Sequence, residues 1–174
     1  FQIIVNLLLW RFSQRSLKRL PRRVSKDICI KEKNRFMVSE KQKQFDLSYL
    51  EMAKVWALNS YCVRRKVGAL IVKDRMIISD GYNGTPSGFE NVCETEEGQT
   101  KSCVLHAEAN AITKVAKSNN SSDGATLYVT DAPCMECSKL IIQAGIKRVV
   151  YNKDYRSTEG LELLEKAGIE ICKY

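Results

Sequence analysis

The chain has 174 residues, 44% of them apolar, and a formal net charge of +8. This length allows one ordinary domain plus an extension. The charge is confined to residues 1–36, which contain ten Lys or Arg against two acidic residues, whereas residues 37–174 contain 18 basic and 18 acidic residues. A neutral domain argues against a nucleic-acid-binding face, which needs a basic surface.

Residues 1–36 are predicted to form a basic, weakly ordered extension to a domain that covers residues 37–174. Their apolar stretch, residues 1–10, is too short to span a bilayer, and its basic cluster follows it, whereas a secretory signal begins with basic residues. A transit peptide is an alternative, because residues 11–23 are basic, contain serine and lack acidic residues. The simplest interpretation makes Met37 the natural start, with translated upstream sequence before it.

The first half of the domain is predicted to be a helix followed by a hairpin. Apolar residues at three- and four-residue spacings predict a helix over residues 47–60. Residues 66–73 and 76–82 predict two strands joined by a tight turn, and the first is apolar enough to be central and buried. The polar segment 83–104 is long for a structureless loop, which indicates a function or a second anchor.

The second half alternates helices and strands. In order, the predicted elements are a helix over residues 107–117, a strand over 125–130, a helix over 133–145, a strand over 146–151, a helix over 161–168 and a strand over 169–172. This alternation predicts parallel pairing with right-handed crossovers. The expected fold class is α/β, a three-layer α/β/α sandwich on a mixed five-stranded sheet.

Two short motifs supply three soft metal ligands. His106 and Glu108 form a His-x-Glu motif, and Pro133, Cys134 and Cys137 form a Pro-Cys-x-x-Cys motif further along the chain. One imidazole and two thiols can bind zinc and leave the fourth tetrahedral position open to water, as a catalytic site requires. Glu108 then remains free to transfer protons.

Both motifs are predicted at helix N-termini. Cys134 and Cys137 project from one face of a first turn, where free N–H groups and the macrodipole lower thiol pKa values. His106 opens the other helix. Because residues two apart point in nearly opposite directions, His106 can share a metal with Glu108 only if the ion lies off the helix end. Two helix starts are therefore predicted to face one zinc ion.

Each motif alone has a simpler interpretation. Cys-x-x-Cys is often a structural zinc knuckle or a redox pair, and His-x-Glu is usually a solvated helix start. Together, and in this order, they match the signature of zinc nucleobase deaminases. His106 is the only histidine in the chain, which rules out a His-rich structural cluster. The combination favours a catalytic zinc site.

With these motifs and this order of elements, residues 46–174 resemble the deoxycytidylate (dCMP) deaminases of the cytidine deaminase superfamily. The glycine-rich segment 81–88 and the segment 141–151 add to the resemblance, and tRNA adenosine deaminases usually lack the glycine-rich one. The resemblance implies a cytidine deaminase-like fold. It also implies hydrolysis of dCMP to dUMP and ammonia, which would supply dUMP for thymidylate synthesis in the cytoplasm.

The same resemblance implies roles for single residues. It makes His106, Cys134 and Cys137 the ligands of Zn²⁺ and makes Glu108 the group that carries protons to the cytosine and to the departing ammonia.

Substrate binding is expected from residues on either side of the first strand and after the fourth. The amide of Asn83 can hold the sugar or base, although the Asn-Gly pair is also an ordinary turn. Arg64 and Tyr155 are the predicted contacts of the 5′-phosphate, chosen from neighbouring basic residues that could equally be solvated.

Many relatives of this kind are regulated and oligomeric. The resemblance implies possible dCTP and dTTP effectors, with Mg²⁺ accompanying dCTP, and a homo-oligomer, either hexamer or dimer. Gly81, Tyr82, Gly84 and Asn110 match the effector-binding positions. No membrane association is expected.

The remaining cysteines leave two alternatives. Cys62, Cys93 and Cys103 match places where some relatives bind a second, structural zinc, with an acidic fourth ligand such as Glu94, but the histidines used there are absent. Buried free thiols are the alternative. Seven cysteines without a secretory signal predict a reducing compartment, and metal or free thiols in preference to disulfides.

Two rival functions remain open. One is a tRNA or other nucleic-acid base deaminase that uses the basic extension as an electrostatic arm. The other is a non-catalytic binding module stabilised by zinc, which would need the cysteines but not Glu108. The neutral domain argues against the first.

Overall fold

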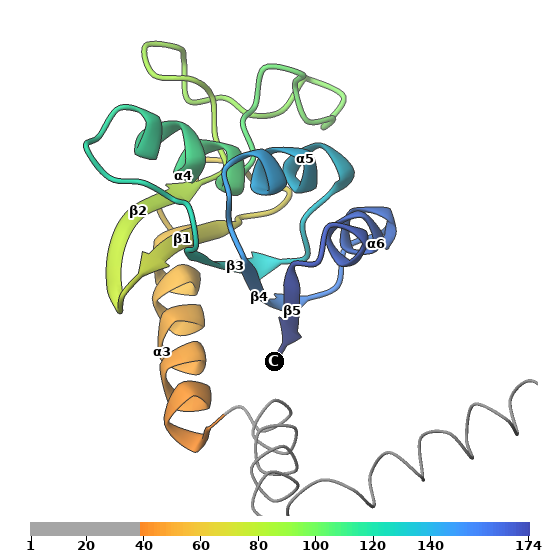
Figure 1. The fold of residues 1–174 in the computed structure, drawn as a ribbon. Helices are drawn as coiled ribbons and strands as arrows, with labels where there is room; N and C mark the ends of the chain where they lie inside the picture. Colours follow the sequence, from red (N-terminus) through yellow and green to blue (C-terminus); the bar gives the residue numbers. More distant parts are fainter. Residues whose placement is uncertain (1–38) are drawn as a thin grey trace, which may run out of the picture. The chain divides into compact units, whose positions relative to one another are not determined.

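The computed structural model describes residues 39–174, which form a five-stranded sheet with four helices (Figure 1). The elements are, in chain order, α3 (Glu40–Ala57), β1 (Gly68–Lys73), β2 (Met76–Tyr82), α4 (Ala107–Ala116), β3 (Thr126–Asp131), α5 (Met135–Gln143), β4 (Arg148–Lys153), α6 (Glu159–Lys166) and β5 (Glu170–Lys173). The strand order is β2-β1-β3-β4-β5.

The sheet is mixed, as predicted. Strand β1 pairs antiparallel with both β2 and β3, whereas β3, β4 and β5 pair in parallel through the α5 and α6 crossovers. The β1–β2 hairpin turns at Asp74 and Arg75, both of which have positive φ angles (50° and 64°). Positive φ at both central residues is the type I′ geometry, whose twist matches that of the flanking strands.

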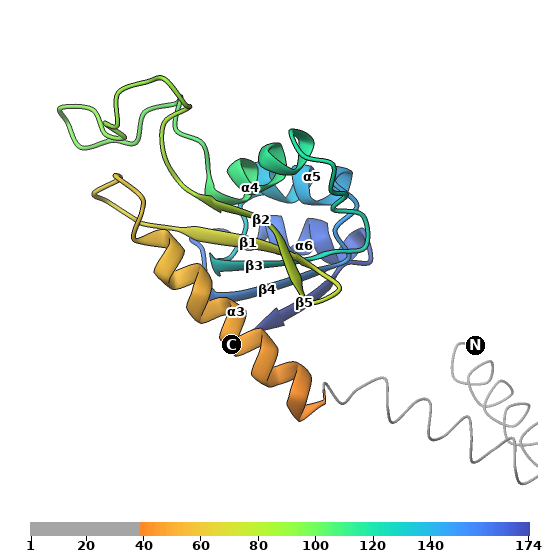
Figure 2. The ribbon, with the colours of Figure 1, turned by 90° about the vertical axis from the view of Figure 1, so that its left-hand side faces the viewer.

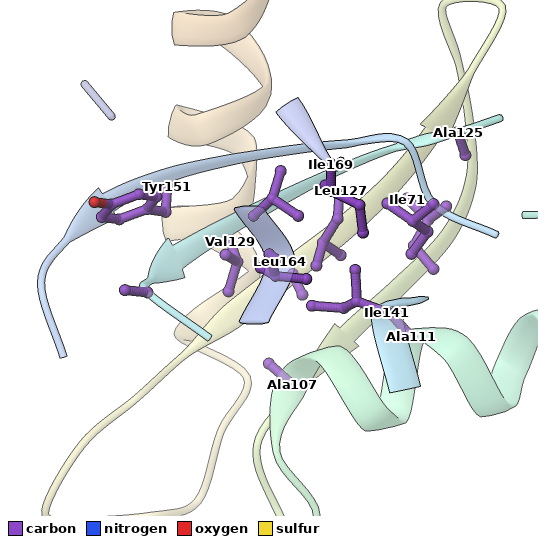
Figure 3. Packing of buried hydrophobic residues seen from close by; sticks show 14 of the residues in the cluster. Ile71, Ala107, Ala111, Ala125, Leu127, Val129, Ile141, Tyr151, Leu164 and Ile169 are labelled. Atoms are coloured by element: carbon purple, nitrogen blue, oxygen red, sulfur yellow. The ribbon is translucent and has the colours of Figure 1, made fainter. Parts of the chain in front are cut away.

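Both faces of the sheet are covered. Leu50 of α3 packs with Leu70 and Tyr128 on one face. On the other face the helices α4, α5 and α6 cover a larger core, in which Leu127 and Ile141 are fully buried (Figures 2 and 3). Residues 68–72 are buried on both sides, which explains why β1 is apolar throughout. The predicted three-layer α/β/α sandwich is confirmed.

The element bounds differ from those predicted by a few residues, except at α3. This helix begins at Glu40 and ends at Ala57, whereas the apolar spacing predicted residues 47–60. The predictions for residues 1–36 and for a start at Met37 lie outside the described residues. Among the described helices, none combines the length and the apolar character needed to cross a membrane.

Candidate metal centre and substrate cavity

The two predicted helix starts lie together. His106 is the N-cap of α4 and Cys134 is the N-cap of α5, and both have extended backbone conformations. Neither side chain caps its own helix. His106 thus precedes the first helical turn of α4. This is the position that was required for His106 and Glu108 to face one metal ion at the helix end.

The three candidate ligands converge. His106 Nδ1 lies 3.4 Å from Cys134 Sγ and 3.4 Å from Cys137 Sγ. All three atoms lie within 4.8 Å of one another, and residues 39–174 hold no second group of this kind. A tetrahedral zinc with bonds of about 2.3 Å to sulfur and about 2.05 Å to nitrogen separates these atoms by about 3.6 Å. The two distances from His106 Nδ1 to the sulfurs are close to this value, so the donor set suits a zinc ion.

The two thiols shift each other's pKa values in opposite directions. A hydrogen bond from Cys137 lowers the pKa of Cys134 to about 3, and the same interaction, together with burial, raises the pKa of Cys137. The hydrogen bond with Cys134 also raises the pKa of His106. The lowered pKa of Cys134 favours its thiolate form, which is the ionisation state that zinc binding requires.

Glu108 is buried beside these ligands. Its residue is only 4% exposed, and burial raises the pKa of its carboxyl group to about 7, although its own backbone N–H and His106 favour ionisation. It hydrogen-bonds with Cys137 and also lines the open cavity. A carboxyl group with a pKa near neutrality can both accept and release protons.

A cavity of about 710 Å³ opens at this centre. Its lining combines His106 and Cys134 of the candidate metal centre with polar residues from the segment before β1, the loop after β2, the end of β3 and the loop after β4. The lining residues are Cys62, Arg64, Arg65, Val67, Asn83, Glu94, Gln99, Thr100, Val104, His106, Ala107, Glu108, Asp131, Ala132, Cys134, Tyr155 and Arg156. A cavity of this size can hold a nucleotide.

Asn83 lines the cavity but is partly occupied by the backbone. Its Oδ1 accepts a hydrogen bond from the Val67 N–H (2.8 Å), and its Nδ2 donates to the Arg65 carbonyl (2.8 Å). These bonds fix the entry into β1. Each polar atom of the amide can still make one more hydrogen bond, so the structural and ligand-binding roles remain compatible.

Arg64 and Tyr155, the predicted phosphate contacts, lie in the same lining. The neighbouring basic residues Arg65 and Arg156, which were the alternatives for the phosphate, lie in this lining too, as does Asp131, which was not predicted. The only available signal for Asp131 was its position at the carboxyl end of β3, where sites on such sheets collect.

The long segment after β2 is anchored rather than structureless. Backbone bridges join Gly84 to Leu105 and Glu94 to Thr100. Glu94 Oε1 also accepts hydrogen bonds from the Val63 N–H at 3.0 Å and from the next backbone N–H at 3.2 Å. Its carboxylate therefore holds the loop to the segment before β1. Figure 1 shows this loop extending from the end of β2.

A disulfide makes the second anchor. Cys62 and Cys93 form a disulfide, whereas Cys103 is free and exposed. The predicted second metal site on these three cysteines is therefore wrong in this structure, and so, for Cys62 and Cys93, is the preference for metal or free thiols over disulfides. The folded chain brings the Cα atoms of Cys62 and Cys93 to 5.1 Å, within the range for a disulfide, and Cys103 is not part of the pair.

The predicted effector residues lie outside the cavity lining. Gly81 packs so closely on the start of α4 that a Cβ would collide with the Ala107 carbonyl, which explains the glycine. Gly84 has open space around it. Asn110 Nδ2 donates to the Tyr82 carbonyl (2.8 Å), which ties α4 to β2. Two of these four residues thus have structural roles of their own.

A protein-family model described as the cytidine and deoxycytidylate deaminase zinc-binding region matches residues 43–153. Among solved structures, the chain is similar to the dCMP deaminase of cyanophage S-TIM5 in complex with dCMP and dUMP, with a TM-score of 0.74 and 45% identity. That match covers 79% of this chain and 100% of the phage chain.

Two curated relatives extend the comparison. ComE operon protein 2 of Bacillus subtilis is 41% identical over 71% of this chain and 67% of its own length. Deoxycytidylate deaminase of Saccharomyces cerevisiae is 33% identical over 82% of this chain and 49% of its own length. The chain thus spans about half the length of the yeast protein. A tRNA:A34 deaminase structure, 22% identical with a TM-score of 0.52, shares the fold.

Proposed function

Because this chain belongs to the cytidine and deoxycytidylate deaminase family, we propose that it hydrolyses dCMP to dUMP and ammonia at a zinc site. His106, Cys134 and Cys137 hold the ion in this proposal. The observation that carries it is the convergence of one imidazole and two thiols beside a cavity that His106, Cys134 and Glu108 line. The phage relative bound to dCMP and dUMP supports the choice of substrate.

The chemistry divides between the metal and Glu108. Bound at this site, zinc would supply the Lewis acidity that makes a water molecule nucleophilic at neutral pH. Glu108 takes the proton from that water as it adds to C4 of the cytosine, and delivers it to N3. It then takes the remaining proton of the added water and transfers it to the amino group, which leaves as ammonia. The residue is only 4% exposed, so the carboxyl group lies largely out of bulk solvent at the cavity wall.

The remaining predicted contacts complete the binding of the nucleotide. Asn83, already fixed by two backbone hydrogen bonds, offers its free amide positions to the sugar or base. Arg64 and Tyr155 lie in the same lining and are proposed as contacts of the 5′-phosphate. Arg64 is oriented by a hydrogen bond from its Nη1 to Thr100 Oγ1 (3.5 Å).

A substrate panel tests this function. Ammonia release is measured with dCMP, CMP, deoxycytidine, cytidine and dCTP, and dCMP is expected to have the highest kcat/KM. A preference for an unphosphorylated nucleoside would overturn the substrate assignment. Inactivity on the whole panel, with RNA or DNA binding that is salt-dependent and lost on deleting residues 1–36, would favour the nucleic-acid deaminase instead.

Regulation is proposed at Gly81, Tyr82, Gly84 and Asn110, with dCTP and Mg²⁺ or dTTP as effectors in a homo-oligomer. The support is local: Lys114 Nζ lies 5.9 Å from the centroid of the Tyr82 ring, outside the cavity lining, and forms an ion pair with Asp80 at 2.6 Å. Rates of dCMP turnover with and without each effector test the proposal, and light scattering with each effector gives the oligomeric state.

A further inference from the structure

The cavity wall around Tyr155 is unusually rich in guanidinium groups. Arg65 and Arg156 each place their Cζ atom 5.5 Å from the centroid of the Tyr155 ring. All three residues line the cavity that contains the candidate metal centre. Two cations on one aromatic ring repel each other, so a neighbouring negative charge helps to hold them there.

Asp131 supplies that charge. Its Oδ1 forms an ion pair with Arg65 Nη2 at 2.5 Å, and its side chain is only 8% exposed, against 44% for Arg65. Its Oδ2 accepts a hydrogen bond from Thr130 Oγ1 (3.0 Å). Thr130 Oγ1 in turn accepts a hydrogen bond from the Gly68 N–H (3.3 Å). The carboxylate is thus fixed to the central strands, while the guanidinium it holds faces the cavity.

Resting on the proposed function, we infer that Asp131 is a positioning residue for nucleotide binding. It holds Arg65 against Tyr155, so that Arg65 and Arg156 together present cationic donors to the 5′-phosphate. Asp131 itself does not touch the substrate in this arrangement. It acts through Arg65.

The hydrogen bonds of Arg65 leave donors for a ligand. Both bonds that it makes within residues 39–174 use Nη2, to Asp131 and to the Asp154 carbonyl (3.4 Å). Its Nε and Nη1 are therefore available to phosphate oxygens, which a guanidinium can bind at two points. In the described part of the chain Arg156 has no acidic partner, so its charge is not offset by a salt bridge.

Arg64 stands in a different environment. Its backbone N–H is bound by the Glu94 carboxylate, and its guanidinium reaches Thr100 on the anchored loop. The guanidinium of Arg64 is therefore tied to the loop after β2 and not to Asp131.

The test compares dCMP with deoxycytidine, which lacks the phosphate. In Asp131→Asn and Arg65→Met we expect KM for dCMP to rise roughly 10-fold or more, with kcat and the kcat/KM for deoxycytidine changed by less than about threefold. The double variant is expected to be no worse than Arg65→Met alone, because Asp131 acts only through Arg65. Glu51→Gln, which removes a carboxylate from an exposed pair with Lys54, is the matched control.

Equal losses for both substrates in the two variants would show a merely structural role and overturn the inference, as would an unchanged KM for dCMP. If the wild-type protein deaminates neither compound, the proposed function fails, and the inference is judged by calorimetry with dUMP and deoxyuridine. It then predicts that Asp131→Asn weakens binding of dUMP only. Equal binding of dUMP by wild type and Asp131→Asn would overturn it.

Discussion

Asp46 and Arg148, 102 residues apart in the sequence, form a two-point ion pair between α3 and the start of β4. Arg148 Nη1 donates to Asp46 Oδ1 at 2.7 Å, and Nη2 donates to Oδ2 at 2.8 Å. The Asp46 side chain is fully buried and that of Arg148 is 12% exposed. The hydroxyl groups of Tyr128 and Tyr174 also donate to Asp46, at 2.8 and 3.0 Å. This network joins α3 to the sheet.

Asp46→Ala is predicted to destabilise the protein by about 3–5 kcal/mol, because it leaves the Arg148 charge and two tyrosine hydroxyls without their shared acceptor. The measurement is urea unfolding followed by circular dichroism. Lys54→Met, which breaks an exposed ion pair with Glu51, is the control and should change stability by less than about 1 kcal/mol. A loss for Asp46→Ala no larger than the control's would contradict this role.

Alkaline pH should weaken the same network. Burial and the hydrogen bond to Asp46 raise the pKa of Tyr128 above its ordinary value of 10. As pH rises, the unfolded chain therefore loses the Tyr128 proton at a lower pH than the folded protein does. Tyr128 leaves the stability unchanged below about pH 10 and lowers it as pH rises above that value. We expect the free energy of unfolding to fall more steeply above pH 10 in wild type than in Tyr128→Phe. Identical slopes in wild type and Tyr128→Phe would contradict the raised pKa of Tyr128.

Cys93→Ser removes the disulfide that anchors the loop after β2. The bonded cysteines are 31 residues apart, and closing a loop of this length stabilises a folded chain by roughly 3–4 kcal/mol. A lower melting temperature and faster proteolysis within residues 83–104 are expected. Thiol titration of unfolded wild type should detect two fewer thiols before reduction than after it. Equal counts would show that no disulfide is present.

Glu108→Gln should separate catalysis from metal binding. The amide keeps the size of the side chain but cannot take a proton from water, so kcat for dCMP is expected to fall at least ~10²–10⁴-fold. Zinc content and melting temperature should remain close to wild type, since Glu108 is not among the three converging ligand atoms. Turnover within tenfold of wild type would remove Glu108 from the proton transfer.

Local patterns were sufficient to predict the sheet. The apolar stretch of β1, the Asp74-Arg75 turn and the helix stops at Gly145 and Gly168 depend on neighbouring residues alone, and both glycines have φ angles of 73°. The start of α3 was missed because residues 40–46 are mostly polar. Their tendency to form a helix comes from propensity and not from an apolar stripe.

Contacts between distant residues could not be predicted in the same way. The metal motifs were visible because each is short and has fixed spacing. The Asp131–Arg65 pair joins residues 66 apart, and the Cys62–Cys93 disulfide depends on where the loop after β2 folds back. No periodicity in the sequence predicts such pairs. Both depend on how the sheet and its loops are arranged in the folded chain.

The most direct test of the metal centre is the zinc content of purified Cys134→Ser, measured by plasma mass spectrometry beside wild type. Cys103→Ser, which changes a free and exposed cysteine, is the matched control. We predict that Cys134→Ser loses one equivalent of zinc per chain together with dCMP deamination, while Cys103→Ser retains both. Wild-type zinc content in Cys134→Ser would contradict the assignment of the site.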